Sequence, residues 1–250
     1  MDGLLDLHNH ILPGMDDGCK TPQESLAALQ EAARQGVQAV FATPHYYPVE
    51  PVEVFLQRRR EAADRLSAYV RAQKAAELPQ VCLGAEVAFR AGLSNEPALR
   101  ELALGGTEYL LLELPFHSWG PEVFRQIRSI STNHALTVVL AHLERYVGTV
   151  PFDQLRKLLQ MDVLVQINAG SFLKLKNRMA VNRLLRHARI DFFGSDCHNL
   201  TDRAPKMGEL AAYLEKNRLS FMLDYANDQA MQLFEQVKPE YKLSFSESVL

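Results

Sequence analysis

Two short stretches near opposite ends of the chain each place two metal-ligand residue types two positions apart. His8 and His10 occur in DLHNH, and Asp196 and His198 occur in GSDCH. Residues i and i+2 of a β-strand project from the same face, so each pair can reach one ion. Imidazole and carboxylate together suit Mn, Fe, Zn or Mg rather than the softer chemistry of thiolates.

Further residues of the same types follow other short apolar segments. They are Asp17, His45, Glu86, Glu113 and His142. Nine ligands exceed what a single ion takes, and they predict two or three closely spaced ions that share carboxylates. Such a centre can clamp the attacking and leaving oxygens in phosphoester cleavage.

The ligand types follow predicted strands that alternate with helical segments. We expect strands near residues 3–8, 39–43, 80–86, 108–113, 136–141, 163–168 and 190–194, and helices within 24–36, 53–73, 122–134, 152–160 and 176–188. Continuous apolar strands alternating with helices indicate a parallel sheet, and seven such units favour a β/α barrel over an open doubly wound sheet. In a barrel the ligand types would all lie on the face at the C-terminal ends of the strands. Thr21-Pro22 and Gly36 predict the two ends of the first helix.

The composition is that of an enzyme-sized α/β protein without a strong charge bias. The 250 residues are 47% hydrophobic with a net charge of -3, which gives no support to binding of nucleic acid or of membrane surfaces. The sequence predicts a single domain over residues 1–250, with an irregular or strand-like tail at 237–250. A signal peptide, a transmembrane segment and a disulfide framework are not expected, so we predict a cytoplasmic protein.

Several conspicuous residues have ordinary structural explanations. His117, His134 and His187 do not share the strand-end placement of the ligand types, and the last two lie near predicted helix ends. The run RRR at 58–60 lies inside a predicted helix and suggests a solvated face. Aromatic residues beside the ligands could stack on a substrate ring or pack at the barrel rim, and the sequence leaves this open for Tyr46, Tyr47, Phe116 and Trp119.

Cys197 and Arg203 also fit the C-x5-R spacing of cysteine phosphatases. That chemistry needs a thiolate of lowered pKa in a cradle of backbone N–H groups. The intervening HNLTD has no glycine, and Asp196 and Asp202 would raise the pKa of the thiol. Cys197 is therefore predicted to have no catalytic role and to lie between two metal ligands in the sequence.

Six motifs together resemble one known family from residue 4 to about residue 208. They are DLHNHILPGMDDG, ATPHYYP, GAEV, LLELP, LAHLERY and GSDCHN. Their order and spacing are similar to those of the polymerase-and-histidinol-phosphatase (PHP) family, and more closely to its bacterial tyrosine-phosphatase branch of the CpsB/YwqE type. The resemblance implies a distorted seven-stranded TIM-like barrel that holds three metal ions, manganese above all.

The same resemblance implies how the ligands are distributed. They would be His8, His10, Glu86 and Asp196 for a first ion, Glu86, Glu113 and His142 for a second, and Asp17, His45 and His198 for a third. The histidinol-phosphatase branch tends to have histidine where this chain has Asp17 and Glu113, so these carboxylates favour the tyrosine-phosphatase branch. That branch would also use Arg145 and Arg203 to grip phosphate, and a guanidinium suits this role because it donates a planar pair of hydrogen bonds.

The predicted reaction is hydrolysis of protein phosphotyrosine by a metal-bound hydroxide, in line and without a phosphoenzyme. The phenol leaves readily, since its pKa is about 10. The resemblance implies the tail of a bacterial tyrosine kinase of capsule or exopolysaccharide synthesis as the partner. A small phosphomonoester such as histidinol phosphate and, with less support, a barrel amidohydrolase activity remain alternatives, and the sequence does not indicate the oligomeric state.

Overall fold

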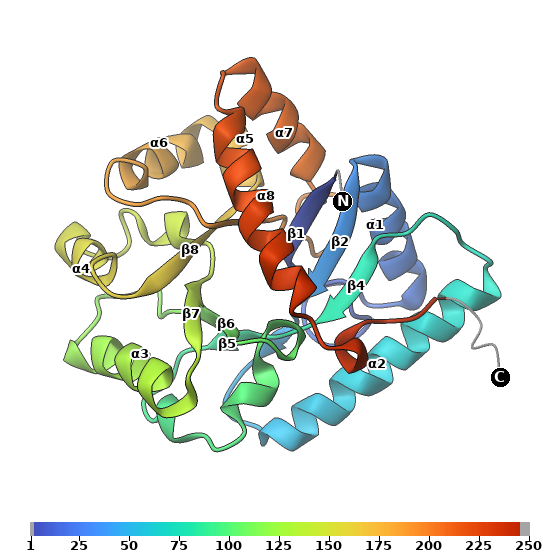
Figure 1. The fold of residues 1–250 in the computed structure, drawn as a ribbon, viewed down its shortest axis with the longest axis horizontal. Helices are drawn as coiled ribbons and strands as arrows, with labels where there is room; N and C mark the ends of the chain where they lie inside the picture. Colours follow the sequence, from blue (N-terminus) through green and yellow to red (C-terminus); the bar gives the residue numbers. More distant parts are fainter. Residues whose placement is uncertain (1–2, 246–250) are drawn as a thin grey trace.

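The computed structural model describes residues 3–245 as a mixed α/β fold whose strands pair in parallel. The strands of this part of the chain are β1 Leu4–Asn9, β2 Val37–Ala42, β3 His45–Tyr46, β4 Gln80–Leu83, β5 Glu86–Ala88, β6 Tyr109–Glu113, β7 Thr137–Leu140, β8 Val163–Asn168 and β9 Phe192–Gly194. They form one sheet of order β1-β2-β4 and a second of order β3-β5-β6-β7-β8-β9. Figure 1 shows these strands surrounded by helices.

Every predicted strand has a counterpart, but the third is divided. Strands β4 and β5 are separated at Gly84, and the short β3 after Pro44 was not predicted. The two sheets adjoin here, where Gly84 donates to the Ala42 carbonyl at 2.9 Å and Glu86 to that of Pro44 at 3.1 Å. A prolyl nitrogen has no hydrogen to donate, which explains why the ladder is interrupted beside Pro44.

Strands β9 and β1 approach each other at their C-terminal ends. The Asp196 N–H donates to the His8 carbonyl at 2.8 Å, and the His10 N–H donates to the Cys197 carbonyl at 2.9 Å. A parallel α/β fold in one domain is thus present as predicted. Closure into a seven-stranded barrel stays a prediction, because the described strands form two sheets.

Helices cover the outside of the strands. They are α1 Pro22–Arg34, α2 Val52–Ala72, α3 Pro121–His134, α4 Phe152–Leu158, α5 Gly170–Leu173, α6 Leu175–Leu184, α7 Met207–Lys216 and α8 Ser220–Glu235. The predicted ends of α1 are confirmed: the Thr21 hydroxyl accepts from Glu24 N, and Gly36 follows the helix with a φ of 81°. Helices α7 and α8 were not predicted from the sequence.

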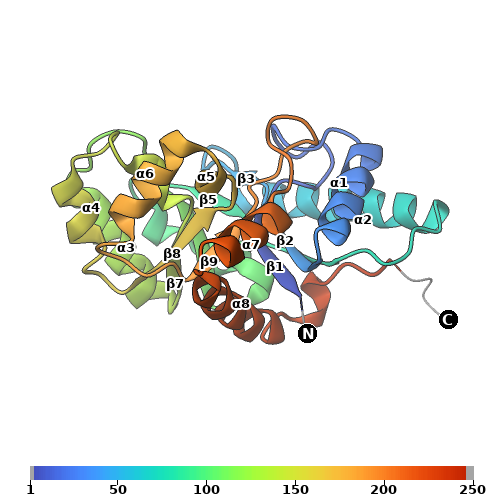
Figure 2. The ribbon, with the colours of Figure 1, turned by 90° about the horizontal axis from the view of Figure 1, so that it is seen from above.

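Helix α8 covers the side of the strands where β1 begins. Its Leu233 and Phe234 pack in one apolar cluster with Phe41 of β2 and Phe192 of β9. Asn227 accepts from the Leu5 N–H through its side-chain oxygen, which fixes the helix beside β1. Figures 1 and 2 show α8 running past the start of this strand. The opposite side, at the C-terminal strand ends, is therefore left to loops.

Arg59 is a correction to the predicted solvated face of α2. Its side chain is buried, and its guanidinium donates to the Gly84 carbonyl at 2.8 Å and lies over the rings of Phe55 and Tyr241. Burial lowers the pKa of Arg59 to about 10. The residue thus ties α2 to the junction between β4 and β5.

Replacement of Arg59 by alanine is expected to destabilise the protein by about 2–4 kcal/mol, because the buried Gly84 carbonyl loses its donor and a cavity remains. Urea denaturation measures the free energy of unfolding. The neighbouring Arg60→Ala is the matched control, since Arg60 is exposed, and it is expected to change this energy by less than about 0.5 kcal/mol. Equal effects of the two substitutions would contradict a structural role for Arg59.

The predicted tail lies partly inside the described residues. After α8, a 3-10 helix covers Pro239–Tyr241, and the Leu243 N–H donates to the Val81 carbonyl at 2.9 Å. Residues 246–250 lie outside the described part. Among the helices of residues 3–245, none combines the length and the apolar composition that crossing a bilayer requires.

Candidate metal centre

The structure places all nine predicted ligands at or just beyond C-terminal strand ends. They are His8 near the end of β1, His10 and Asp17 after β1, His45 after β2 where the short β3 begins, Glu86 after β4 where the short β5 begins, Glu113 at the end of β6, His142 after β7, and Asp196 and His198 after β9. Residues up to 190 positions apart in sequence thereby surround one site.

Glu86 lies at the centre of this site. Its buried carboxylate is 2.8 Å from His142 Nε2, 3.1 Å from His8 Nε2, 3.1 Å from His45 Nδ1 and 3.3 Å from His10 Nε2. Burial alone would raise the pKa of Glu86, but the surrounding imidazoles hold it well below its usual range. The carboxylate is therefore ionised and can bridge cations.

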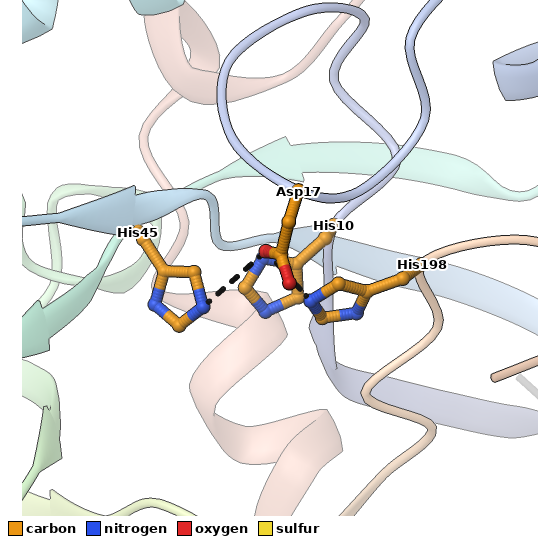
Figure 3. Close-up of side chains that lie close together, drawn as sticks. All are labelled: His10, Asp17, His45 and His198. Carbon is orange, nitrogen blue, oxygen red and sulfur yellow. Dashed lines mark ion pairs between the residues drawn. The ribbon is translucent and has the colours of Figure 1, made fainter.

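A second group surrounds Asp17, whose carboxylate reaches in from the loop after β1. Its Oδ1 is 3.1 Å from His198 Nε2 and 3.7 Å from His45 Nε2 (Figure 3). Together with His10, these residues offer ligand atoms that all lie within 4.8 Å of one another. One ion can reach all of them.

Asp196 forms another group with His8 of β1 and with His10, which directly follows this strand. Its Oδ1 is 3.5 Å from His10 Nε2 and 3.8 Å from His8 Nε2. Although burial opposes ionisation, these imidazoles lower the pKa of Asp196. Asp196 and His142 have φ angles of 52° and 33°, in the left-handed region that is costly for residues with a Cβ. The chain bears this cost at two of the candidate ligands.

The donor atoms of these groups fit divalent cations. His45 Nδ1, His142 Nδ1 and His198 Nε2 are buried and make no hydrogen bond within the described residues. Burial alone would lower the pKa of His10 and His142, but carboxylate contacts raise it to about 10 and about 9, so protons occupy positions that cations can take. One more possible ligand group contains His45 with Glu86 and Glu113, whereas the resemblance implied His142 beside these carboxylates. His142 Nε2 is 3.4 Å from Glu113 Oε1 and lies at the edge of this group.

Asp16 supports the centre and was missed by the sequence analysis. Its carboxylate is 2.7 Å from His10 Nδ1 and accepts from the His45 backbone N–H at 2.8 Å. Burial raises the pKa of Asp16, but the hydrogen bond with His10 outweighs this effect and lowers it to about 2. A carboxylate that is hydrogen-bonded to one nitrogen of an imidazole ring fixes the orientation of the ring, so that the other nitrogen points toward a metal. Adjacency to Asp17 is the signal that could have indicated it.

Gln166 and Asn168 of β8 are further supports that were not predicted. Gln166 Oε1 is 3.2 Å from His8 Nδ1 and accepts from the His142 backbone N–H at 2.7 Å. Asn168 donates to Asp196 Oδ2 at 2.8 Å. The two residues lie two positions apart near the end of a predicted strand, so both side chains project from the same face of it. This spacing is the signal in the sequence that could have indicated them.

The two predicted arginines lie at the edge of the centre. Arg203 Nη2 donates to Asp196 Oδ1 at 2.8 Å, and its Nη1 is 3.4 Å from Asp17 Oδ2. Arg145 Nη1 is 3.7 Å from Asp196 Oδ2, and its guanidinium lies 5.0 Å above the ring of Phe116. Both side chains are partly exposed and can receive an anion.

The aromatic residues divide into two kinds. Tyr46 and Trp119 are buried: the Tyr46 hydroxyl donates to the Glu50 carbonyl, and the Trp119 indole donates to that of Pro115. The possibility that Tyr46 and Trp119 stack on a substrate ring is therefore wrong. Tyr47 and Phe116 are exposed and stack on His45 and His142, with ring centroids 5.2 Å and 5.9 Å apart.

Cys197 is buried between two candidate ligands, and burial raises the pKa of its thiol. The thiol is thus protonated at neutral pH and a poor nucleophile. Replacement of Cys197 by serine is expected to leave kcat/KM for the predicted phosphotyrosine hydrolysis within about threefold of the unmodified chain. Steady-state kinetics with a phosphotyrosine peptide checks this, and loss of turnover with an intact metal content would indicate cysteine chemistry instead.

The three remaining histidines are separate from the centre. His134 Nε2 is 2.9 Å from the Ser94 carbonyl near the end of α3. His117 is exposed, and His187 follows α6 and contacts Phe152. None of them belongs to a candidate metal group of the described residues.

The family model for CpsB/CapC proteins of capsular polysaccharide synthesis matches residues 4–234. The chain belongs to this family. It is 32% identical to the tyrosine-protein phosphatase YwqE of Bacillus subtilis, over 88% of each chain. It is 29% identical to the tyrosine-protein phosphatase CpsB of Streptococcus pneumoniae, over 92% of this chain and 95% of that one.

Solved structures give the same result for this CpsB/CapC member. A structure from work on YwqE of Bacillus subtilis and CpsB of Streptococcus pneumoniae, described as unique metal-dependent tyrosine phosphatases, matches with a TM-score of 0.80. It is 28% identical, and the match covers 94% of this chain and 96% of that one. A β-aspartyl dipeptidase of Fervidobacterium islandicum AW-1 matches at 14% identity and a TM-score of 0.56, over 97% of this chain and 77% of that one, which shows a shared fold alone.

Proposed function

We propose that this CpsB/CapC member is a metal-dependent protein-tyrosine phosphatase. The observation that carries the proposal is the Glu86 carboxylate, surrounded by four imidazoles, with Arg145 and Arg203 beside the adjoining Asp196. Nitrogen and oxygen ligands beside two guanidinium groups match the needs of a phosphate dianion. The family and its tyrosine-phosphatase relatives support the same reaction.

We assign the ligands of the ions as the resemblance implies. The first ion would be held by His8, His10, Glu86 and Asp196, the second by Glu86, Glu113 and His142, and the third by Asp17, His45 and His198. Manganese is the metal that the resemblance implies, and nitrogen and oxygen donors are compatible with Mn, Fe, Zn or Mg. Asp16 and Gln166 keep the ring nitrogens of His10 and His8 directed into the centre.

Bound divalent cations supply an activated water and positive charge for the phosphoryl group. The chain itself orients the substrate: Arg203 and Arg145 donate to the phosphoryl oxygens and neutralise charge that develops on them. Asp196 and Phe116 hold these guanidinium groups in place. Tyr47 and Phe116 expose ring surface beside the centre, where a phenol can pack. The leaving phenolate needs little protonation, since tyrosine has a pKa of about 10.

The physiological substrate is expected to be a tyrosine-phosphorylated protein, with the tail of a bacterial tyrosine kinase of capsule synthesis as the partner. A peptide tail suits this site because Arg145 and Tyr47 are exposed at its rim. The capsular polysaccharide description of the family supports this pathway.

A panel of substrates tests the proposal. Protein stripped by a chelator is assayed with a phosphotyrosine peptide, a phosphoserine peptide, histidinol phosphate and a cyclic amide, with Mn, Fe, Zn and Mg added back separately. Turnover of the phosphotyrosine peptide that disappears with the chelator and returns most strongly with Mn is expected. Preferential turnover of histidinol phosphate or of the amide would contradict the proposal.

A further inference from the structure

A cavity of about 330 Å³ adjoins the candidate metal centre on the side of α5 and the loop after β9. Arg145, Asp196 and Arg203 line both the cavity and the centre. A group bound in this cavity is therefore adjacent to the position proposed for the reacting phosphate. The other residues that line the cavity have no direct role in the proposed hydrolysis.

Two lysines on that wall have no part in the centre. Lys174 precedes α6 and is exposed, and Lys206 precedes α7 and is half-buried. Neither side chain forms an ion pair or a hydrogen bond within residues 3–245. By contrast, Arg203 and Arg145 already contact Asp196. Among the described residues, the two lysines are thus the cations of this cavity that have no carboxylate partner.

The cavity carries an excess of two positive charges, because four cationic side chains and only two carboxylates line it. Of the carboxylates, Asp196 is a candidate metal ligand and accepts from Asn168 and Arg203. Asp202 is exposed and accepts from the Thr201 hydroxyl. A wall of this charge favours an anion over a neutral or cationic group.

The rest of the lining consists of polar residues with Gly170 and Ala204, and it leaves room for the lysine stem. Asn177 and Ser171 are among the lining residues, so a hydrophilic group can be accepted. A Cβ at Gly170 would lie 3.7 Å from Lys206 Cδ, so the lysine stem passes directly over this glycine. The stem is thereby supported while its ammonium group remains available.

We propose that this cavity is a second anion-binding subsite, in which Lys174 and Lys206 receive an acidic or phosphorylated side chain of the phosphotyrosine peptide. The inference rests on the proposed phosphatase function and narrows its substrate to peptides with a second anion close to the reacting residue. The anion belongs to a residue within about two positions, because the two sites share Arg145 and Arg203 and an extended chain advances about 3.3–3.6 Å per residue.

Phosphotyrosine peptides that differ at one neighbouring position test the subsite. The neighbour is glutamine, glutamate, lysine or a second phosphotyrosine, placed one or two positions before or after the reacting residue. For the unmodified chain, kcat/KM is expected to be about fivefold or more higher with an anionic neighbour than with glutamine, the scale of one partly exposed ion pair. A higher value with either anion supports the subsite, and the larger ratio identifies carboxylate or phosphate as its ligand.

The variants Lys174→Ala, Lys206→Ala and their combination are expected to reduce this ratio, and the double variant should bring it close to one. Lys206→Glu should reverse the preference, so that a lysine neighbour is favoured over glutamate. Lys216→Ala is the matched control, since this exposed lysine lies in the last turn of α7 and should leave the ratio unchanged. Added salt should lower the preference of the unmodified chain.

The subsite is contradicted if the unmodified chain has equal kcat/KM for peptides with anionic and with glutamine neighbours. It is likewise contradicted if the lysine variants have the same ratio of these two values as the unmodified chain. It is also contradicted if the variants slow all peptides by the same factor. Failure of the proposed function gives a different result, in which the unmodified chain hydrolyses none of the phosphotyrosine peptides while its metal content is intact.

Discussion

Replacement of Glu86 by glutamine is expected to lower phosphatase kcat/KM by about 1,000-fold and to reduce the bound metal per chain. Glu86 contacts four imidazoles between 2.8 Å and 3.3 Å and is the shared carboxylate of the centre. Glutamine keeps the shape but removes the charge that holds cations together, and loss of charge stabilisation in a transition state has effects of this size. Steady-state kinetics and elemental analysis of the purified variant measure both effects.

Glu215→Gln is the matched control for this substitution. Glu215 is exposed near the end of α7, so its amide variant should retain metal and activity. Circular dichroism of the Glu86 variant verifies that it is folded. A folded Glu86→Gln protein with full metal content and full activity would exclude the centre as the catalytic site.

Replacement of Arg203 by alanine is expected to lower kcat/KM by about 100-fold while metal content is retained. Its guanidinium donates to Asp196 at 2.8 Å and reaches Asp17 at 3.4 Å, and it is partly exposed toward the substrate side. A donor that stabilises charge on transferring oxygens contributes about 100-fold to 1,000-fold. Arg203→Lys should recover only part of the loss, because an ammonium group keeps the charge but not the planar pair of donors.

Arg128→Ala provides the comparison for the loss of an arginine away from the centre. Arg128 is exposed on α3, and its removal should leave kcat/KM unchanged. If Arg203→Ala loses its metal as fully as Glu86→Gln does, the residue acts on the ligands rather than on the phosphate. The assay of both metal and kinetics therefore separates the two roles.

The fold was largely predictable from local pattern, and its exceptions have identifiable causes. Apolar runs located every predicted strand, because a parallel strand buried on both faces has a continuous apolar sequence. The break between β4 and β5 at Gly84 and the burial of Arg59 depend on contacts between distant segments. A short-range pattern contains no information on whether a helical arginine will meet a free carbonyl on another element.

The site shows the same division. The strand-end positions of His8, His10, Asp196 and His198 follow from the two-residue period of a strand and were readable in advance. The sequence did not predict that Asp16 would contact His10 while Asp17 lies beside His198 and His45. Adjacent residues in a loop point in directions that are defined only by the folded loop.

The sequence by itself determined the set of candidate nitrogen and oxygen ligands, their positions after strands, and the two arginines proposed to bind phosphate. The tertiary structure decided which of these atoms meet, with Glu86 at the centre, Asp16 behind His10 and the two lysines beside Arg203. Residue type and strand period are properties of a few neighbouring residues. Burial, ion pairing and cavity walls result from the packing of segments far apart in the chain.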